Sequence, residues 1–172
     1  CKKALSNHSK FKKIKVIYNG IDAHFKKSQK SNVKSKKIRI GYFGKIEKRK
    51  GLHLLVEALN DLRFKNIVLN IYGDGDDAYK RKLELKNTQK KFDLNFYKPV
   101  SDITKLLSLT DILVLPSIKF ESFGMVLIEA MRQKVPVICS NSGGMKEIVK
   151  NNKNGLVFKN KDIKDLKKKL SI

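Results

Sequence analysis

The stretch DILVLPSIKFESFGMVLIEAM, residues 111–131, begins as a buried strand, passes through a short polar loop and continues with helical periodicity. It carries two carboxylates, Glu121 and Glu129, in a chain with only 16 acidic residues. If the whole interval between them were helical, they would lie about 80° apart around the helix axis and about 12 Å apart along it, too far for one small site. The more economical interpretation leaves Glu121 on a loop and Glu129 on the second turn of a helix.

The start of this helix is suited to an anionic ligand. We expect it near Phe123 or Gly124, with Ser122 as a candidate N-cap. The free amides of Phe123, Gly124 and Met125 can then bind a phosphate or sugar oxygen. A carboxylate on each side of these amides can bind a pair of hydroxyls. The pattern fits a ligand with a phosphate in the middle and a sugar ring at each end.

Strand and helix patterns alternate along most of the chain from residue 38 onward. This order predicts an α/β fold, a Rossmann-like parallel sheet with helices on both faces. Ligands of such sheets bind at the carboxyl ends of the strands, in the strand-to-helix loops. The strands are expected at 38–44, 66–73, 94–97, 111–116, 135–140 and 155–158, and the helices at 51–62, 78–91, 101–110, 123–134, 143–151 and 161–170.

The first 37 residues have a different character. They are rich in Lys and Ser, and only KVIYNGID, residues 15–22, predicts a strand and an Asn-Gly turn. Residues 27–37 are typical of a linker or exposed loop. A length of 172 residues favours one domain or one large fragment, and a chain that begins with Cys rather than Met fits a piece of something longer.

Composition limits the classes of function. The net charge of +23 comes from 39 Lys and Arg against 16 Asp and Glu, and only five of the cations are Arg. Nucleic-acid readers rely more on Arg, and readers of single strands interleave aromatic residues with basic ones, so we expect no nucleic-acid partner. A scattered Lys excess favours a solvated surface, and next an anionic membrane face or a phosphate-bearing ligand.

Cysteine content and hydropathy bear on location. The two cysteines, Cys1 and Cys139, make a disulfide framework unfavoured and fit a reducing compartment. No run approaches the roughly 18 apolar residues of a membrane span, and no signal peptide opens the chain. We therefore expect a cytoplasmic protein, with peripheral association at the inner membrane face as a further expectation.

The loop GKIEKRKG, residues 44–51, is the best candidate for a diphosphate cradle. It follows a strand and opens a helix, whose N-terminus offers free amides and partial positive charge. Lys45, Lys48, Arg49 and Lys50 add cations between two glycines that permit close approach. The loop is neither a G-x-G-x-x-G fingerprint nor a P-loop. The alternative is a Lys-rich loop in a Lys-rich protein.

Two further strand-to-helix loops carry weaker signals. Asp74 and Asp76 in YGDGDD form a D-x-D pair, which can hold a divalent cation, but Gly-Asp-Gly is ordinary turn chemistry and we expect no metal. Gly143 and Gly144 in SNSGGMKE precede a short helix whose start would face the same crevice. A tight turn without a ligand is an equally good interpretation of this second loop.

In this order, the motifs GYFGKIEKRKG, YGDGD, DILVLPSIKFESFGMVLIEAM, VPVICSNSGGMKEIV and NGLVF resemble those of GT-B glycosyltransferases of family 4, a large retaining group. The resemblance covers about residues 13–172, and the E-x7-E of Glu121 and Glu129 is the hallmark of the group. It implies the C-terminal half of a GT-B fold. An interdomain segment and linker would occupy 1–37, and a nucleotide-sugar-binding domain 38–172, with the N-terminal acceptor domain absent.

The resemblance also implies a role for each matching residue. Glu121 matches the catalytic carboxylate beside the transferred sugar, and Glu129 the carboxylate on the nucleotide ribose. Lys50 matches the Lys that binds the donor diphosphate. Lys45 stands where the family usually has Arg, which keeps the charge and loses the bidentate geometry. The other implied donor-binding positions are Gly44, Pro99 and Val100 near the base and diphosphate, and Ser122, Phe123, Gly124 and Met125 near the sugar and distal phosphate.

Members of that family transfer a sugar from a nucleotide diphosphate with retention of configuration. The resemblance therefore implies a retaining hexosyltransferase with a UDP- or GDP-hexose donor, no cofactor and no required metal, because basic residues and helix ends neutralise the leaving diphosphate. The implied partners are the nucleotide sugar and the protein's own N-terminal acceptor domain. Without that domain the fragment is expected to be inactive. A membrane-bound lipid or a cell-envelope polysaccharide precursor is the expected acceptor.

A glycoside hydrolase also uses two carboxylates, but it needs them about 5–10 Å apart and has no diphosphate cradle, so the basic loop argues against it. A nonenzymatic sugar-nucleotide sensor and a phosphorylase of similar fold remain as alternatives.

Overall fold

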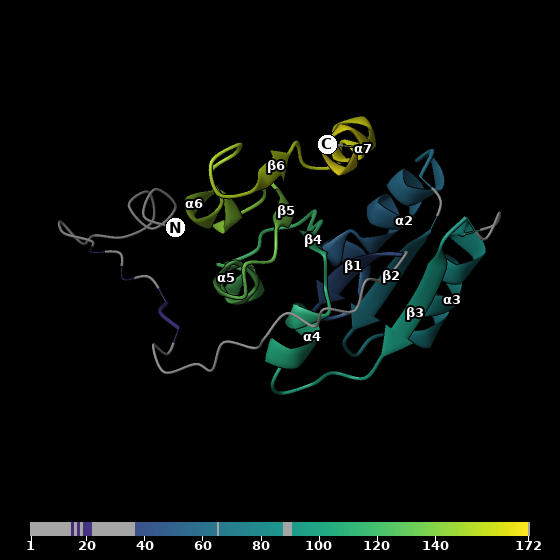
Figure 1. Ribbon diagram of the computed structural model, residues 1–172, viewed down its shortest axis with the longest axis horizontal. Coiled ribbons are helices and arrows are strands. Elements are labelled where there is room, and N and C mark those ends of the chain that lie inside the picture. The colour runs from purple at the N-terminus through teal and green to yellow at the C-terminus, as the bar shows by residue number, and fades with distance from the viewer. Residues whose placement is uncertain are drawn as a thin grey trace, which may run out of the picture.

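The computed structural model describes residues 15, 17, 19–21, 37–64, 66–87 and 91–171. Within them, a six-stranded sheet has the order β3-β2-β1-β4-β5-β6, and every neighbouring pair is parallel (Figure 1). This confirms the predicted parallel sheet. Its strands are β1 (Ile38–Phe43), β2 (Ile67–Tyr72), β3 (Asp93–Tyr97), β4 (Ile112–Leu115), β5 (Val137–Ser140) and β6 (Leu156–Phe158).

Helices cover both faces of the sheet, as the alternating pattern predicts. In Figure 1, α2, α3 and α7 lie on one side of the strands and α4, α5 and α6 on the other. The helical elements are η1 (Lys48–Lys50), α2 (Leu52–Asn60), α3 (Asp77–Lys86), α4 (Thr104–Ser108), α5 (Met125–Arg132), α6 (Met145–Ile148) and α7 (Ile163–Leu170).

The core follows from the periodicity of the sequence. In α2, Leu52, Leu55, Val56 and Leu59 recur at helical spacing and are at most 1% exposed. Strand β4, ILVL, is apolar throughout because both of its faces are covered, and β5 is buried along its whole length. The result is one hydrophobic core beneath the loops at the carboxyl ends of the strands.

The strand order has a topological switch point between β1 and β4. The chain passes from β3 at one edge of the sheet to β4 on the far side of β1, so the order reverses there. α/β proteins bind their ligands at such a point, outside the carboxyl ends of the strands. The loops after β1 and β4 are the two loops that the sequence singles out, the basic loop at 44–51 and the segment that carries Glu121.

The bounds of several helices differ from those expected. The helix after β4 begins at Met125 and has Gly124 as its N-cap with φ 86°, and no side chain caps it, so the prediction of Ser122 as the N-cap is wrong. The left-handed conformation suits Gly, which sets the entry to the helix two residues later than Ser122. The helix expected at 101–110 shortens to α4, because the Asp102 carboxylate accepts a hydrogen bond from the Thr104 amide (2.9 Å).

Other expected elements end early or lie outside the described residues. The helix expected at 78–91 ends at Lys86, and the one expected at 143–151 is a single turn. The strand and turn expected at 15–22 fall on a segment of which residues 15, 17 and 19–21 are described, and these have no regular structure. The linker expected at 27–37 lies outside the described residues except for its last position.

Candidate active site

A pocket opens at the carboxyl ends of β1, β2 and β3. Its volume is about 350 Å³, and it brings together four of the predicted positions, which come from two separate loops. Its floor is formed by strand ends that the prediction did not include. The lining residues are Phe43, Gly44, Lys45, Tyr72, Gly73, Asp74, Pro99, Val100 and Ile103.

Three aromatic rings stack across the strand ends beside this pocket. The ring of Tyr72 lies between those of Phe43 and Tyr97, with centroid distances of 4.7 and 4.8 Å and interplanar angles of 8° and 16°. The three residues occupy paired positions of β1, β2 and β3. Burial raises the pKa of the Tyr72 phenol, so it stays protonated. The sequence holds the signal, since each of these strands ends in an aromatic residue.

The most specific contact of the site joins the loops after β1 and β4. Lys50 Nζ lies 2.5 Å from Glu121 Oε2, and the two side chains are only 14% and 15% exposed. The hydroxyl of Ser117 donates a hydrogen bond to the same carboxylate oxygen (3.3 Å). Because both side chains are so little exposed, removing either partner would leave a poorly solvated charge without compensation, which costs more than it does at a surface pair. Two residues predicted from separate motifs therefore meet at the switch point of the sheet.

The four cations of the basic loop have different surroundings. Lys50 contacts Glu121, and Lys45 lines the pocket with an exposed side chain. Arg49 forms an ion pair with Glu47 at 2.7 Å. Lys48 is exposed on η1. Of these four cations, Lys45 lies in the pocket and Lys50 contacts Glu121. They are the two cations for which the sequence predicts a contact with the donor diphosphate.

The start of α5 lies directly after the Glu121 loop. Gly124 is buried and Met125 is the first helical residue, and without a side-chain cap the first amides of the helix retain their capacity for a ligand. Phe123 precedes the N-cap, so it is not part of the helix. Ser122 is exposed on the loop.

Glu129 lies on the second turn of α5. Its side chain is partly buried, and burial raises the pKa of its carboxyl. Within the part of the chain that the structure describes, the carboxylate has no hydrogen-bond or ion-pair partner. A half-buried carboxylate without a donor is poorly solvated, and hydroxyl groups of a ligand would supply the missing donors.

The second glycine loop packs against the backbone of Glu121. The Gly144 amide donates a hydrogen bond to the Glu121 carbonyl (2.8 Å). Gly143 has φ 59°, and a Cβ built on it would lie 2.1 Å from the same carbonyl oxygen. This loop therefore lies against the backbone of Glu121, and its glycines serve close packing of one loop on another.

The two carboxylates of the D-x-D pair lie in different surroundings. Asp74 lines the pocket. Asp76 is the N-cap of α3, where its Oδ1 accepts a hydrogen bond from the Ala78 amide (2.8 Å). Among the described residues, His, Cys, Asp and Glu form no group of three or more that could hold a metal ion.

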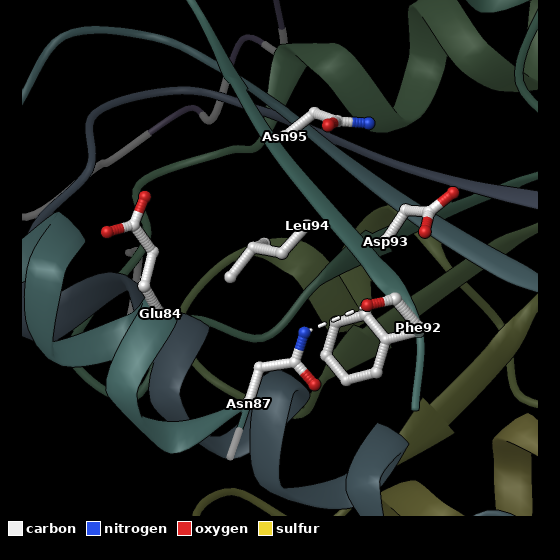
Figure 2. A pocket seen from close by; sticks show the side chains of 6 residues that line it. All are labelled: Glu84, Asn87, Phe92, Asp93, Leu94 and Asn95. Carbon is white, nitrogen blue, oxygen red and sulfur yellow. Dashed lines mark hydrogen bonds between the residues drawn. The ribbon is translucent and has the colours of Figure 1, made fainter. Parts of the chain in front are cut away.

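A second hollow of about 350 Å³ lies between α3 and the start of β3 (Figure 2). Figure 2 shows the side-chain amide of Asn87 donating a hydrogen bond to the Phe92 carbonyl, at 2.9 Å. Because β3 begins at Asp93 and runs parallel to β1, this hollow lies at the amino ends of the strands. It is therefore at the opposite edge of the sheet from the candidate site.

Comparison with known proteins assigns the chain to a family. The model of the glycosyl transferases group 1 family matches residues 24–171. The chain belongs to this family. It spans about two-fifths of the length of the curated relatives that it matches, at 42%, 42% and 40% for three of them.

Individual relatives of this group 1 glycosyl transferase chain agree with the family. An uncharacterized glycosyltransferase of Methanocaldococcus jannaschii is 31% identical over 158 residues, which are 90% of this chain and 42% of that protein. The capsular polysaccharide biosynthesis glycosyltransferase CapM of Staphylococcus aureus is 29% identical over an alignment of 176 positions, which covers 96% of this chain and 43% of CapM.

Solved structures agree with the predicted fold. The crystal structure of Anabaena HepE in complex with UDP and glucose has a TM-score of 0.71 and 25% identity, over 77% of this chain and 37% of HepE. The prediction that the chain has the fold of the C-terminal half of a GT-B protein is confirmed. None of the described helices has both the length and the apolar character of a membrane span.

Proposed function

We propose that the chain is the donor-binding half of a retaining, family 4 glycosyltransferase, which takes a hexose from UDP- or GDP-hexose. The observation that carries the proposal is the contact of Lys50 with Glu121 beside the start of α5, next to the pocket after β1. The binding of UDP and glucose by the structural relative HepE supports this ligand class.

In this proposal the pocket and the start of α5 divide the donor between them. The base lies against Pro99 and Val100, and the ribose hydroxyls donate to Glu129. The diphosphate contacts Lys45 and Lys50 together with the first amides of α5. These cations and the positive end of the helix stabilise the negative charge that develops on the leaving diphosphate, without a metal ion or another cofactor.

Glu121 is the proposed catalytic residue, next to the transferred hexose. Its carboxylate would stabilise positive charge that develops on the sugar as the bond to the diphosphate breaks. The acceptor is held by an N-terminal domain of the same protein, and holding both reactants in one geometry supplies about 7–11 kcal/mol of the barrier. The 172 residues alone are therefore proposed to bind a donor and to transfer nothing.

The proposal also includes a membrane surface and an acceptor. With a net charge of +23, the protein would associate peripherally with an anionic membrane on its cytoplasmic face. A precursor of a cell-envelope polysaccharide is the proposed acceptor, and the relative CapM is described as a capsular polysaccharide biosynthesis enzyme.

Calorimetry with UDP-glucose and GDP-mannose, each with and without EDTA, tests the proposal. We expect one of the two nucleotide sugars to bind, EDTA to leave the affinity unchanged, and added salt to weaken it because the diphosphate contacts are ionic. No free nucleotide should be released with candidate acceptors. Absence of binding to either ligand would overturn the donor-binding role, and loss of binding in EDTA would assign a metal to Asp74 and Asp76.

A further inference from the structure

The backbone of residues 117–119 leads directly to Glu121 and is in no regular secondary structure. Each of its three consecutive carbonyl groups accepts a hydrogen bond from a side chain of a distant segment. The bonds run from Ser140 Oγ to the Ser117 oxygen (2.5 Å), from Asn160 Nδ2 to the Ile118 oxygen (2.9 Å) and from Ser142 Oγ to the Lys119 oxygen (2.8 Å).

The opposite edge of the same segment is bound to the loop of Lys50. The amides of Ile118 and Lys119 both donate to the Arg49 carbonyl, at 2.9 and 3.3 Å. Arg49 immediately precedes Lys50. The carbonyl edge therefore fixes the segment to the far half of the sheet, and the amide edge fixes it to the residue next to the partner of Glu121.

The three donor side chains are themselves firmly placed. Ser140 is the last residue of β5 and is fully buried, and Ser142 is 7% exposed. The main-chain amide of Asn160 donates a hydrogen bond to Asn141 Oδ1 (2.8 Å), which orients Asn160 in the turn between β6 and α7. The hydroxyls of Ser140 and Ser142 are buried and donate to loop carbonyls, so they are not placed to bind a ligand.

We propose that Ser140, Ser142 and Asn160, the carbonyl clamp, are positioning residues that hold the Glu121 carboxylate at Lys50. An unclamped loop of irregular backbone would sample other conformations, and a contact of 2.5 Å tolerates little displacement. The clamp acts through Glu121 and contacts no reacting atom. Its consequence for donor binding rests on the function proposed above, whereas its effect on the ion pair does not.

The first experiment needs no ligand. A double-mutant cycle of Lys50→Met and Glu121→Gln, followed by urea unfolding, measures the coupling between the two side chains. The cycle is then repeated with Ser142→Ala in the background. We expect the coupling to fall by about half or more, because the loop no longer holds the carboxylate in place. Ser142→Thr keeps the hydroxyl and should restore the coupling.

A matched control separates positioning from general loss of stability. Ser108 is also 7% exposed and donates its hydroxyl to a backbone carbonyl, that of Lys105 (2.7 Å), but it lies in α4. Ser108→Ala should lower the free energy of unfolding and leave the Lys50–Glu121 coupling unchanged. If Ser142→Ala does not fold, Asn160→Ala takes its place. Unchanged coupling in the clamp variant would overturn the inference.

The second experiment measures UDP-glucose affinity by calorimetry in four proteins: the parent, Ser142→Ala, Glu121→Gln and the combination. We expect Ser142→Ala to weaken UDP-glucose binding roughly threefold to tenfold, because the displaced Glu121 carboxylate loses its proposed hydrogen bond to the hexose, and to have no further effect when Glu121→Gln is present. Equal losses in both backgrounds would contradict action through Glu121. If the parent chain binds no nucleotide sugar, the proposed function fails and the coupling experiment still decides the role of the clamp.

Discussion

Lys50 Nζ and Glu121 Oε2 lie 2.5 Å apart although their residues belong to different loops of the sheet. The same ammonium group is the proposed ligand of the donor diphosphate. Glu121 therefore contacts the same cation that the proposed diphosphate would contact, and the two anions would compete for it. Donor binding must loosen the ion pair or share the cation between a carboxylate and a phosphate.

This competition predicts that Glu121→Gln raises affinity for UDP. Removing one negative charge beside the diphosphate removes both a competitor and a like-charge repulsion, and we expect a gain of about tenfold, or about 1.4 kcal/mol. Calorimetry with UDP measures it. Glu57→Gln is the control, because Glu57 pairs with Lys86 at 3.0 Å on exposed surface. Lower or unchanged affinity of Glu121→Gln would show that the pair does not compete with the ligand.

The basic loop supplies a second prediction. Lys50→Ala should weaken UDP binding far more than uridine binding, since its cation faces the diphosphate, and we expect a loss of roughly tenfold to a hundredfold. Lys48→Ala is the matched control, because Lys48 is exposed on η1 and should change little. Calorimetry with both ligands separates the effects. Equal behaviour of the two variants would mean that the loop acts only as diffuse positive charge.

The sequence predicts much of this arrangement because the signals are local. Apolar runs between helical patterns locate all six described strands, and parallel connection follows from their alternation. Gly44, Lys45, Pro99 and Val100 converge on one pocket because they follow strands of the same sheet. Hydrophobic periodicity does not predict the order of the strands in the sheet, because long-range packing decides which strands lie beside β1.

Contacts between distant segments account for what sequence reasoning missed. The aromatic stack depends on the register of β1, β2 and β3, although each strand visibly ends in an aromatic residue. The carbonyl clamp brings side chains from 23 and 42 positions away to one short loop. Ser122 failed as an N-cap because Gly124, in a left-handed conformation, decides where the chain turns into the helix.

Replacing Glu129 by Gln should raise the stability of the fold and lower its affinity for a nucleotide. Burial raises its pKa in the folded state above the unfolded value, so its contribution to stability is full below the unfolded pKa and is lost as the pH rises through the folded pKa. At pH 7 the charged carboxylate therefore lowers stability. Glu129→Gln should raise Tm at pH 7 relative to the parent, with the difference vanishing near pH 4.

The same substitution should weaken nucleotide binding. Hydrogen bonds to a charged group contribute about 1.5–3 kcal/mol, and Gln retains only part of this, so we expect a loss of about tenfold in UDP affinity. Thermal unfolding at the two pH values and calorimetry test both effects in one variant. A lower Tm at pH 7 would show that a stabilising partner holds the carboxylate, and unchanged affinity would contradict its place on the ribose.

The contact of Gly143 with Glu121 supports the last prediction. A side chain at Gly143 would require φ near 59° and would place its Cβ 2.1 Å from the Glu121 carbonyl oxygen, so the backbone at Glu121 must shift. Gly143→Ala should therefore lower the free energy of unfolding by about 2 kcal/mol or more and weaken UDP-glucose binding in the variant that remains folded. Gly20→Ala is the control, because a Cβ there meets no atom within 4 Å. Urea unfolding and calorimetry give the two readouts. Equal stability of the two Ala variants would show that the second glycine loop does not hold Glu121 in place.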